Sequence, residues 1–132
     1  MRDRFGIDIS ILVRLATGDP AREFDECVRR LGRLVQDGPA EVFASNQVIG
    51  EAYVALQHHY GVPKQDCRDA LRSVLQSGLV RPLNGEAVIE ALGARGGCGL
   101  LDRLIADDYG RAGLATLTLE RKMATLPGAK RL

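Results

Sequence analysis

The sequence has few cysteines, and none of them is placed to form a pair. Its 132 residues include only Cys27, Cys67 and Cys98, an odd number spread along the chain without a C-x-x-C motif. This pattern argues against a disulfide framework and against a thiolate zinc site. Free thiols are typical of a reducing compartment, so we expect a cytoplasmic protein. Cys27 and Cys67 fall within helical patterns and are expected to be small core residues.

Membrane signals and a strong net charge are also missing. No apolar run approaches the length of a membrane span, and residues 1–16 lack the cleavage site and separate basic region of a signal peptide. We therefore expect no membrane association. The net charge is +1, which gives no global attraction to nucleic acid, so such a role would need a local basic patch. The candidate basic residues are Arg29, Arg30 and Arg33 on one expected helix, and Lys122, Lys130 and Arg131 near the C-terminus. The alternative is an ordinary solvated surface, which is the better interpretation for the first group.

The chain length fits a single domain, residues 1–132, without repeats or linkers. Apolar residues follow strand-like and helix-like spacings in alternation. This alternation predicts an α/β fold with a central, mostly parallel sheet flanked by helices. The expected strands are residues 5–7, 41–44, 79–83 and 114–119, with an edge strand at 129–132, and the expected helices are residues 11–16, 21–36, 47–60, 64–76, 86–94 and 100–113.

Asp8 interrupts an apolar run at the expected carboxyl end of the first strand. Open α/β sheets bind their ligands at this edge, and a buried carboxylate without a partner is costly. Asp8 therefore caps the next helix, pairs with a base or holds a metal. Ser10 is a candidate either to orient Asp8 or a metal-bound water, or to cap the helix itself.

Three further carboxylates occupy comparable places. Glu51 lies on the expected apolar face of its helix, which indicates a functional role or a buried ion pair with Arg14. Asp102 is expected in the first turn of a helix that follows a glycine-rich loop. Glu120 directly follows a late strand, as a ligand or as an ordinary first-turn helix acid.

These acids are expected to converge. In a parallel sheet with right-handed crossovers, strand ends and helix starts share one edge, so Asp8 and Glu120 should meet there with Asp102 in reach. Asp107 and Asp108 lie roughly 8 Å further along the same helix and are expected away from that edge. Clustered acids repel one another unless a cation neutralises them, and carboxylates suit Mg²⁺ or Mn²⁺. Taken singly, however, each acid is more commonly explained by helix capping.

Four segments follow one another in an order that is typical of a known family. They are residues 8–15 (DISILVRL) with 17–19 (TGD), 45–51 (SNQVIGE), 101–106 (LDRLIA) and 116–122 (TLTLERK), followed by LPGA at 126–129. Together they resemble the PIN domains, and within that family the VapC-type toxins of bacterial toxin–antitoxin pairs. The resemblance covers nearly the whole chain.

The resemblance implies a three-layer PIN-like fold and a Mg²⁺- or Mn²⁺-dependent endoribonuclease that hydrolyses RNA phosphodiesters with a metal-activated water. It also implies a homodimer and a cognate antitoxin protein as the inhibitory partner. The implied metal ligands and catalytic residues are Asp8, Glu51, Asp102 and Glu120, supported by Ser10. Thr118 is a strand residue that could support the site through a hydrogen bond, and Arg121 and Lys122 are either contacts to an RNA backbone or solvated charges.

Two positions depart from the family pattern. The fourth acid is usually Asp, whereas this chain has Glu120, and many members carry an additional Asp where this chain has Gly99. These departures motivate an alternative, a catalytically weakened PIN-fold binding module that acts through RNA or protein contacts. A further alternative is a structural α/β domain in which the four acids are unrelated and lie far apart.

Overall fold

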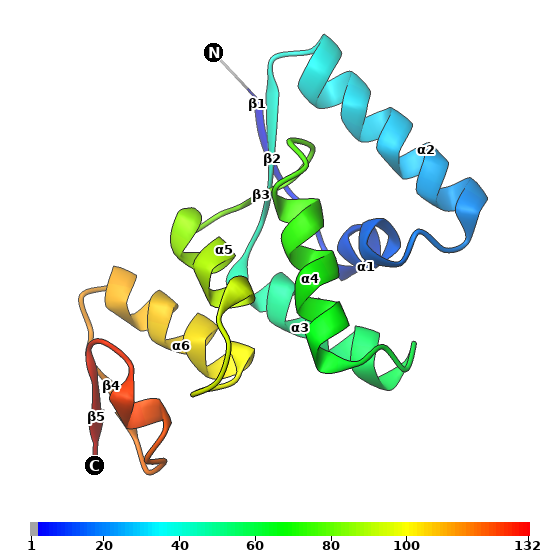
Figure 1. Ribbon diagram of the computed structural model, residues 1–132. Coiled ribbons are helices and arrows are strands. Elements are labelled where there is room, and N and C mark those ends of the chain that lie inside the picture. Colours follow the sequence, from blue (N-terminus) through cyan, green and yellow to red (C-terminus); the bar gives the residue numbers. More distant parts are fainter. Residues whose placement is uncertain (1–2) are drawn as a thin grey trace.

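Three parallel strands form the central sheet of the structure, a computed structural model that describes residues 3–132 (Figure 1). The strands are β1 (Asp3–Gly6), β2 (Ala40–Ala44) and β3 (Arg81–Pro82), in the spatial order β1-β2-β3. Strand β3 lies at one edge, as the proline predicts, since proline cannot donate to a strand ladder. Strand β1 lies at the other edge and pairs with β2 from Asp3 opposite Ala40 to Gly6 opposite Phe43.

The helices occupy the positions that the apolar spacing predicts. They are α1 (Ile9–Thr17), α2 (Ala21–Gly32) with the π-helical turn η1 (Arg33–Asp37), α3 (Asn46–His58), α4 (Lys64–Leu75), α5 (Glu86–Gly93) and α6 (Leu100–Arg111). Local signals set their starts: the Ser45 hydroxyl accepts a hydrogen bond of 3.2 Å from the amide of Val48 and caps α3. Within residues 3–132, none of these helices combines the length and the apolar character needed to cross a bilayer.

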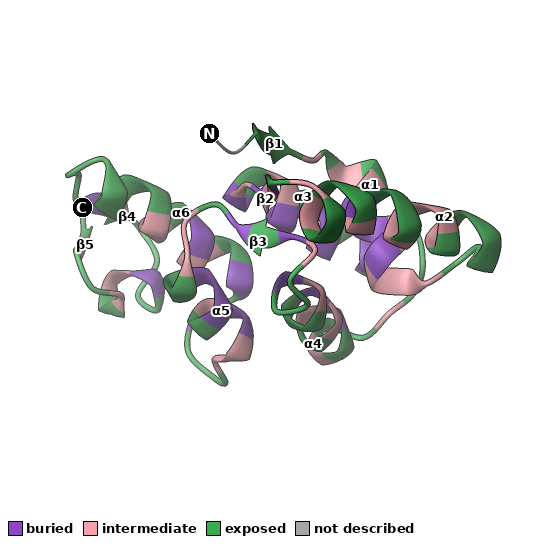
Figure 2. Cartoon of the chain, turned by 90° about the horizontal axis from the view of Figure 1, so that it is seen from above, coloured by how far each residue is buried: buried purple, intermediate pink, exposed green. Residues whose placement is uncertain are grey.

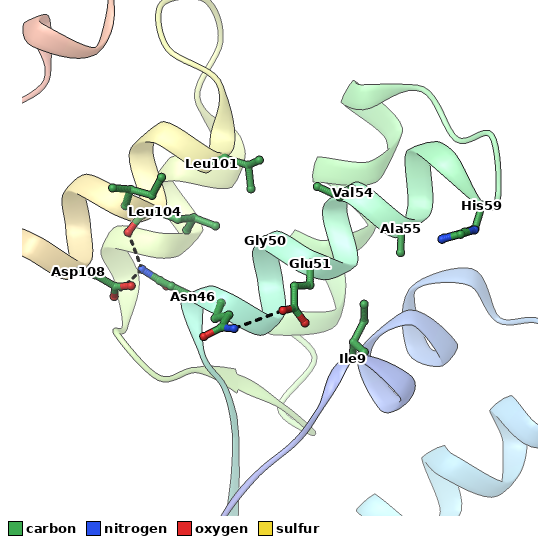
Figure 3. A pocket seen from close by; sticks show the side chains of 12 residues that line it. Ile9, Asn46, Gly50, Glu51, Val54, Ala55, His59, Leu101, Leu104 and Asp108 are labelled. Carbon is green, nitrogen blue, oxygen red and sulfur yellow. Dashed lines mark hydrogen bonds between the residues drawn. The ribbon is translucent and has the colours of Figure 1, made fainter. Parts of the chain in front are cut away.

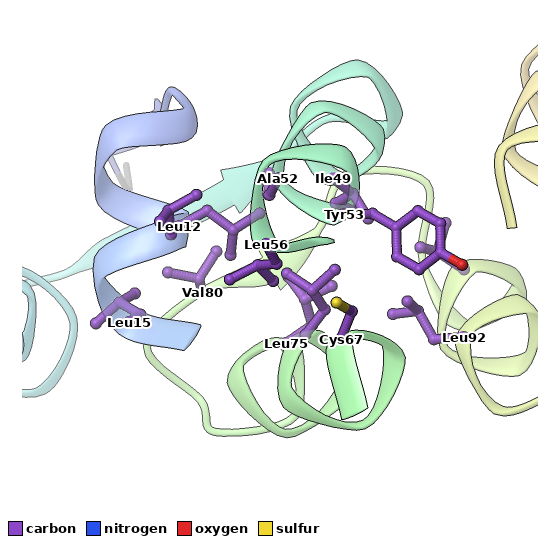
Figure 4. Close-up of a cluster of buried hydrophobic side chains, with 14 of the residues drawn as sticks. Leu12, Leu15, Ile49, Ala52, Tyr53, Leu56, Cys67, Leu75, Val80 and Leu92 are labelled. Atoms are coloured by element: carbon purple, nitrogen blue, oxygen red, sulfur yellow. The ribbon is translucent and has the colours of Figure 1, made fainter. Parts of the chain in front are cut away.

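The hydrophobic core lies between β2 and helices α1, α3, α4 and α5. Leu12, Ile49, Leu56 and Leu92 are fully buried there (Figure 4), and burying each such side chain contributes about 1.5–3 kcal/mol. Cys67 belongs to this core, and Cys27 packs at its margin, as predicted. All three cysteines are free thiols. Figure 2 shows that burial is concentrated in this part of the molecule, while β1 is exposed.

The late strands form a second, separate sheet. Strand β4 (Thr116–Thr118) pairs in parallel with β5 (Ala129–Arg131), and the 3-10 turn η2 (Met123–Thr125) lies between them in sequence. Figure 1 shows this pair beyond α6, away from β1. The parallel pairing is confirmed, but the prediction that late strands join the central sheet is wrong for this structure. The Cys98 thiol, in the loop before α6, donates to the carbonyl of Lys122 (2.9 Å), so this loop contacts the segment between β4 and β5.

Candidate carboxylate site

A groove of about 620 Å³ lies between the start of α1, helix α3 and helix α6 (Figure 3). Its wall is mostly apolar, with polar groups at its margin. Three of the four predicted acidic segments border it: Glu51 lines it directly, Ile9 follows Asp8, and Leu101 precedes Asp102. The full set of lining residues is Ile9, Asn46, Gln47, Gly50, Glu51, Val54, Ala55, His59, Leu101, Leu104, Ile105 and Asp108.

Asp8 is exposed and caps α1 through its own side chain. Its Oδ1 accepts hydrogen bonds from the Ser10 amide (2.9 Å) and from the Ser10 hydroxyl. The bond from the Ser10 hydroxyl is the main cause that lowers the pKa of Asp8, followed by the backbone bond. Asp8 is therefore an ionised carboxylate at neutral pH, and Ser10 orients it as predicted. The capping role is confirmed, and it leaves the metal role as a prediction.

Glu51 is exposed, so the prediction of a carboxylate on a buried helix face is wrong. The buried face of α3 carries Ile49, Ala52 and Leu56, and the turn angle of the helix points Glu51 into the groove instead. Its Oε1 accepts a hydrogen bond of 3.3 Å from Gln47. The alternative ion pair with Arg14 is not formed among the described residues.

Asp102 lies half-buried in the first turn of α6, as predicted. The positive end of the helix dipole favours a carboxylate at this position. Gly99 immediately precedes the helix at its N-cap. A Cβ built on Gly99 would meet no atom within 4 Å, so the structure leaves room for a side chain there.

Glu120 lies in a different part of the molecule. It is exposed after β4, and its amide donates to the Thr118 hydroxyl (3.0 Å), so Thr118 orders the local turn. The structure does not bring Glu120 to Asp8, because β4 belongs to the second sheet. Arg121 and Lys122 follow it on the surface. Within residues 3–132, no group of three or more acids, histidines or cysteines is close enough to hold a metal.

Two further acids lie at the strand edge, which the sequence analysis placed wrongly. Asp107 Oδ2 accepts hydrogen bonds of 2.9 Å from both Asn46 and Asn84, and Asp108 Oδ1 accepts bonds of 3.1 and 2.8 Å from the same two side chains. Asn46 follows β2 and Asn84 follows β3. The later turns of α6 therefore approach this edge. The distance of a residue along the helix axis does not predict this, because it says nothing about the direction in which the helix runs. Arg111 also pairs with Asp107 (3.2 Å). The sequence does place an asparagine shortly after each of these two strands, and this pattern could have predicted polar contacts at their ends.

Comparisons with known proteins assign no family to the chain. No protein-family model matches it, and no curated protein sequence matches it. Function is therefore inferred from the residues of the groove and their geometry.

Proposed function

We propose that the protein is a Mg²⁺- or Mn²⁺-dependent endoribonuclease of the PIN type, acting as the toxin of a toxin–antitoxin pair. One observation carries the proposal: the segments of Asp8, Glu51 and Asp102 come from separate helices and border one groove at the carboxyl end of β1. Such an edge is where α/β sheets bind their ligands. The order of the motifs in the sequence supports the same conclusion.

The electrostatics of the groove support cation binding. None of the ion pairs among the described residues involves Asp8, Glu51 or Asp102. Uncompensated carboxylates attract a divalent cation, and oxygen ligands are those that Mg²⁺ and Mn²⁺ select. A bound cation would supply an activated water and stabilise charge at the phosphate. The donor types fit such a cation. Among residues 3–132 the acids are not gathered tightly enough to enclose a metal, so the complete ligand set would need a further contribution.

The groove also has a chemistry that suits an inhibitory partner. Val54, Leu101 and Ile105 expose apolar side chains along it, next to the carboxylate of Glu51. A cognate antitoxin peptide would inhibit by placing a basic side chain among the acids beside this wall. Arg121 and Lys122 are proposed contacts to an RNA backbone.

The competing proposal is a weakened PIN-fold binding module, and one observation favours it. Glu120, the fourth acid, lies outside the groove in this structure. A binding module would keep RNA or protein contacts without efficient metal-dependent cleavage.

Cleavage of a mixed RNA pool by the purified protein tests the proposal. We expect cleavage that requires Mg²⁺ or Mn²⁺ and that falls at least about 100-fold in Asp8→Asn, since metal-site losses of this order are common. Asp25→Asn, an exposed acid on α2, is the matched control and should cleave like the unchanged protein. Equal cleavage by all three proteins would indicate a contaminant, and no cleavage by a folded, antitoxin-free protein would favour the binding module.

A further inference from the structure

Among residues 3–132, no strand pairs with the outer edge of β1. The order of the central sheet places β1 at its end, paired with β2 on one side, and all four residues of β1 are exposed. The backbone N–H and C=O groups on its open side can pair with another strand. Phe5, at the third position of the strand, is an exposed aromatic side chain beside this edge.

The C-terminal unit, residues 114–132, has an uncovered apolar face. In the β4–β5 ladder Leu117 pairs with Lys130, so these two side chains lie on one face. Leu119 and Leu132 directly follow the two strands, two residues after Leu117 and Lys130. These three leucines are 63%, 73% and 81% exposed. Parallel sheets are normally covered on both faces, and an isolated two-stranded sheet is marginally stable. The unit therefore has the character of a sheet fragment that needs a partner.

The groove on the body of the molecule has a matching apolar wall. Val54, Leu101 and Ile105 are exposed along it. The chain's own C-terminal unit is not placed to cover this wall, because Leu126 and Pro127 border a different hollow with the opposite face of α6. Figure 3 shows that the orange-red C-terminal segment lies at the margin, away from the groove. The leucines and the groove of one copy thus remain apart.

We propose that the C-terminal unit of a second copy covers the groove, with Leu117 and Leu119 against the α3–α6 wall and β4 along the open edge of β1. Strand β4 is the pairing edge, because β5 carries Lys130 and Arg131, charges that are typical of a strand left exposed to solvent. Each copy gives its unit and receives the other, which closes a two-fold symmetric dimer.

This exchange also completes the carboxylate site, a consequence that rests on the proposed function. Asp8 lies two residues beyond the end of β1, and Glu120 lies two residues beyond the end of β4. Pairing the two strands in parallel brings both acids to the same edge. The site then consists of Asp8, Glu51 and Asp102 from one copy and Glu120 from the other.

The oligomeric state of the full chain tests the exchange without RNA or metal. We expect the unchanged protein to be a dimer by light scattering at micromolar concentration. In Leu117→Asp the dimer dissociation constant should rise at least tenfold, which shifts the protein to monomer. Leu114→Asp is the matched control, since Leu114 is 56% exposed in the same unit but precedes β4 and lies outside the leucine face. Circular dichroism checks that both variants fold. A monomeric unchanged protein, or a dimer that Leu117→Asp leaves intact, overturns the proposal.

Disulfide cross-linking distinguishes exchange from closure within one chain. Phe5→Cys and Leu117→Cys are made as separate variants, one carrying a size tag, and mixed under mild oxidation. Exchange predicts a cross-link between the tagged and untagged chains that neither variant forms alone. A third protein carries both Phe5→Cys and Leu117→Cys in one chain. If only this double variant cross-links, and only within single chains, the unit closes on its own β1 and the second-copy proposal is overturned. Neither experiment measures RNA cleavage. The exchange can therefore be confirmed or overturned whether or not the protein proves to be a nuclease.

Discussion

Ser10 holds Asp8 in place with two hydrogen bonds to the same oxygen, one from its backbone amide and one from its hydroxyl. These two bonds give Asp8 two roles. Asp8 caps α1, which fixes the start of that helix, and the same bonds lower the pKa of its carboxyl group at the carboxyl end of β1. A helix cap and a candidate metal ligand are therefore compatible at this position.

Replacing Ser10 with alanine should raise the pKa of Asp8 toward its ordinary value, because the largest cause of its lowered pKa is removed. A lowered carboxyl pKa stabilises the folded state above the unfolded-state pKa, and this contribution is lost as the pH falls through the folded-state pKa. The stability difference between the two proteins should therefore be present at neutral pH and shrink in acid. NMR titration of the Asp8 carboxyl carbon measures the pKa, and Ser73→Ala on the exposed face of α4 is the control. An unchanged Asp8 titration would contradict the assignment.

Asn46→Ala should destabilise the protein by about 1–3 kcal/mol, since it removes one of the two amide donors to Asp107 and Asp108 and the side-chain donor to a buried backbone carbonyl. Asn46 is 5% exposed and also donates to the Leu104 carbonyl (3.1 Å). Asn84→Ala removes the bonds that Asn84 donates to the same two carboxylates. Because Asn84 is less buried, this variant should lose less stability. Urea unfolding of both variants measures the difference. Equal, near-zero losses would mean that the amide contacts do not hold α6 on the sheet edge.

Gly99→Asp should keep the fold and raise metal-dependent activity if the proposed function holds. The N-cap of α6 favours an aspartate over glycine by a few tenths of a kcal/mol, and the side chain meets open space there. The new carboxylate lies one turn before Asp102. Thermal unfolding and RNA cleavage are measured together, with Gly110→Asp, which is also open but lies near the end of the same helix, as the control. Unchanged cleavage in a stable Gly99→Asp protein would show that this position does not limit activity.

Mixing two inactive variants should restore activity if copies share the acid site. Asp8→Asn and Glu120→Gln damage different parts of that site, and in a mixed dimer one of the two sites receives both acids intact. Random pairing makes half of the dimers mixed, so about one quarter of the normal cleavage rate is expected. The mixture is incubated to allow exchange before the assay. If the mixture stays at the level of the separate variants, each copy builds its site from its own residues.

The sequence predicted the helices and the parallel strands well, because their signals are local. Asp8 after a strand, Ser45 as a cap and Pro82 at an edge each act within a few residues. The partition into two sheets was not predicted, since strand order depends on contacts between distant segments such as Cys98 and Lys122.

The candidate site shows the same division between local and distant information. Topology led us to expect Asp8 and Glu120 at one edge with Asp102 in reach, and this is wrong for Glu120, which follows a strand of the second sheet. The groove is lined instead by Glu51 and by Ile9 and Leu101, the neighbours of Asp8 and Asp102. The exposure of Glu51 was missed because the apolar residues of its helix are compatible with two adjacent faces as the buried one. The packing of Ile49 and Leu56 in the core decides which face is buried, and Glu51 lies outside it. The positions of Asp107 and Asp108 depended on the direction of α6, which spacing does not encode.

Direct measurement of Mn²⁺ binding tests the central claim that Asp8, Glu51 and Asp102 act together at one groove. Electron paramagnetic resonance reports free Mn²⁺ during titration of the unchanged protein, of Asp8→Asn, Glu51→Gln and Asp102→Asn, and of the control Asp25→Asn. We predict one class of site that each of the three groove variants weakens at least about tenfold, or about 1.4 kcal/mol, while the control binds normally. Binding that is absent from the folded protein, or that survives all three substitutions, would contradict the account.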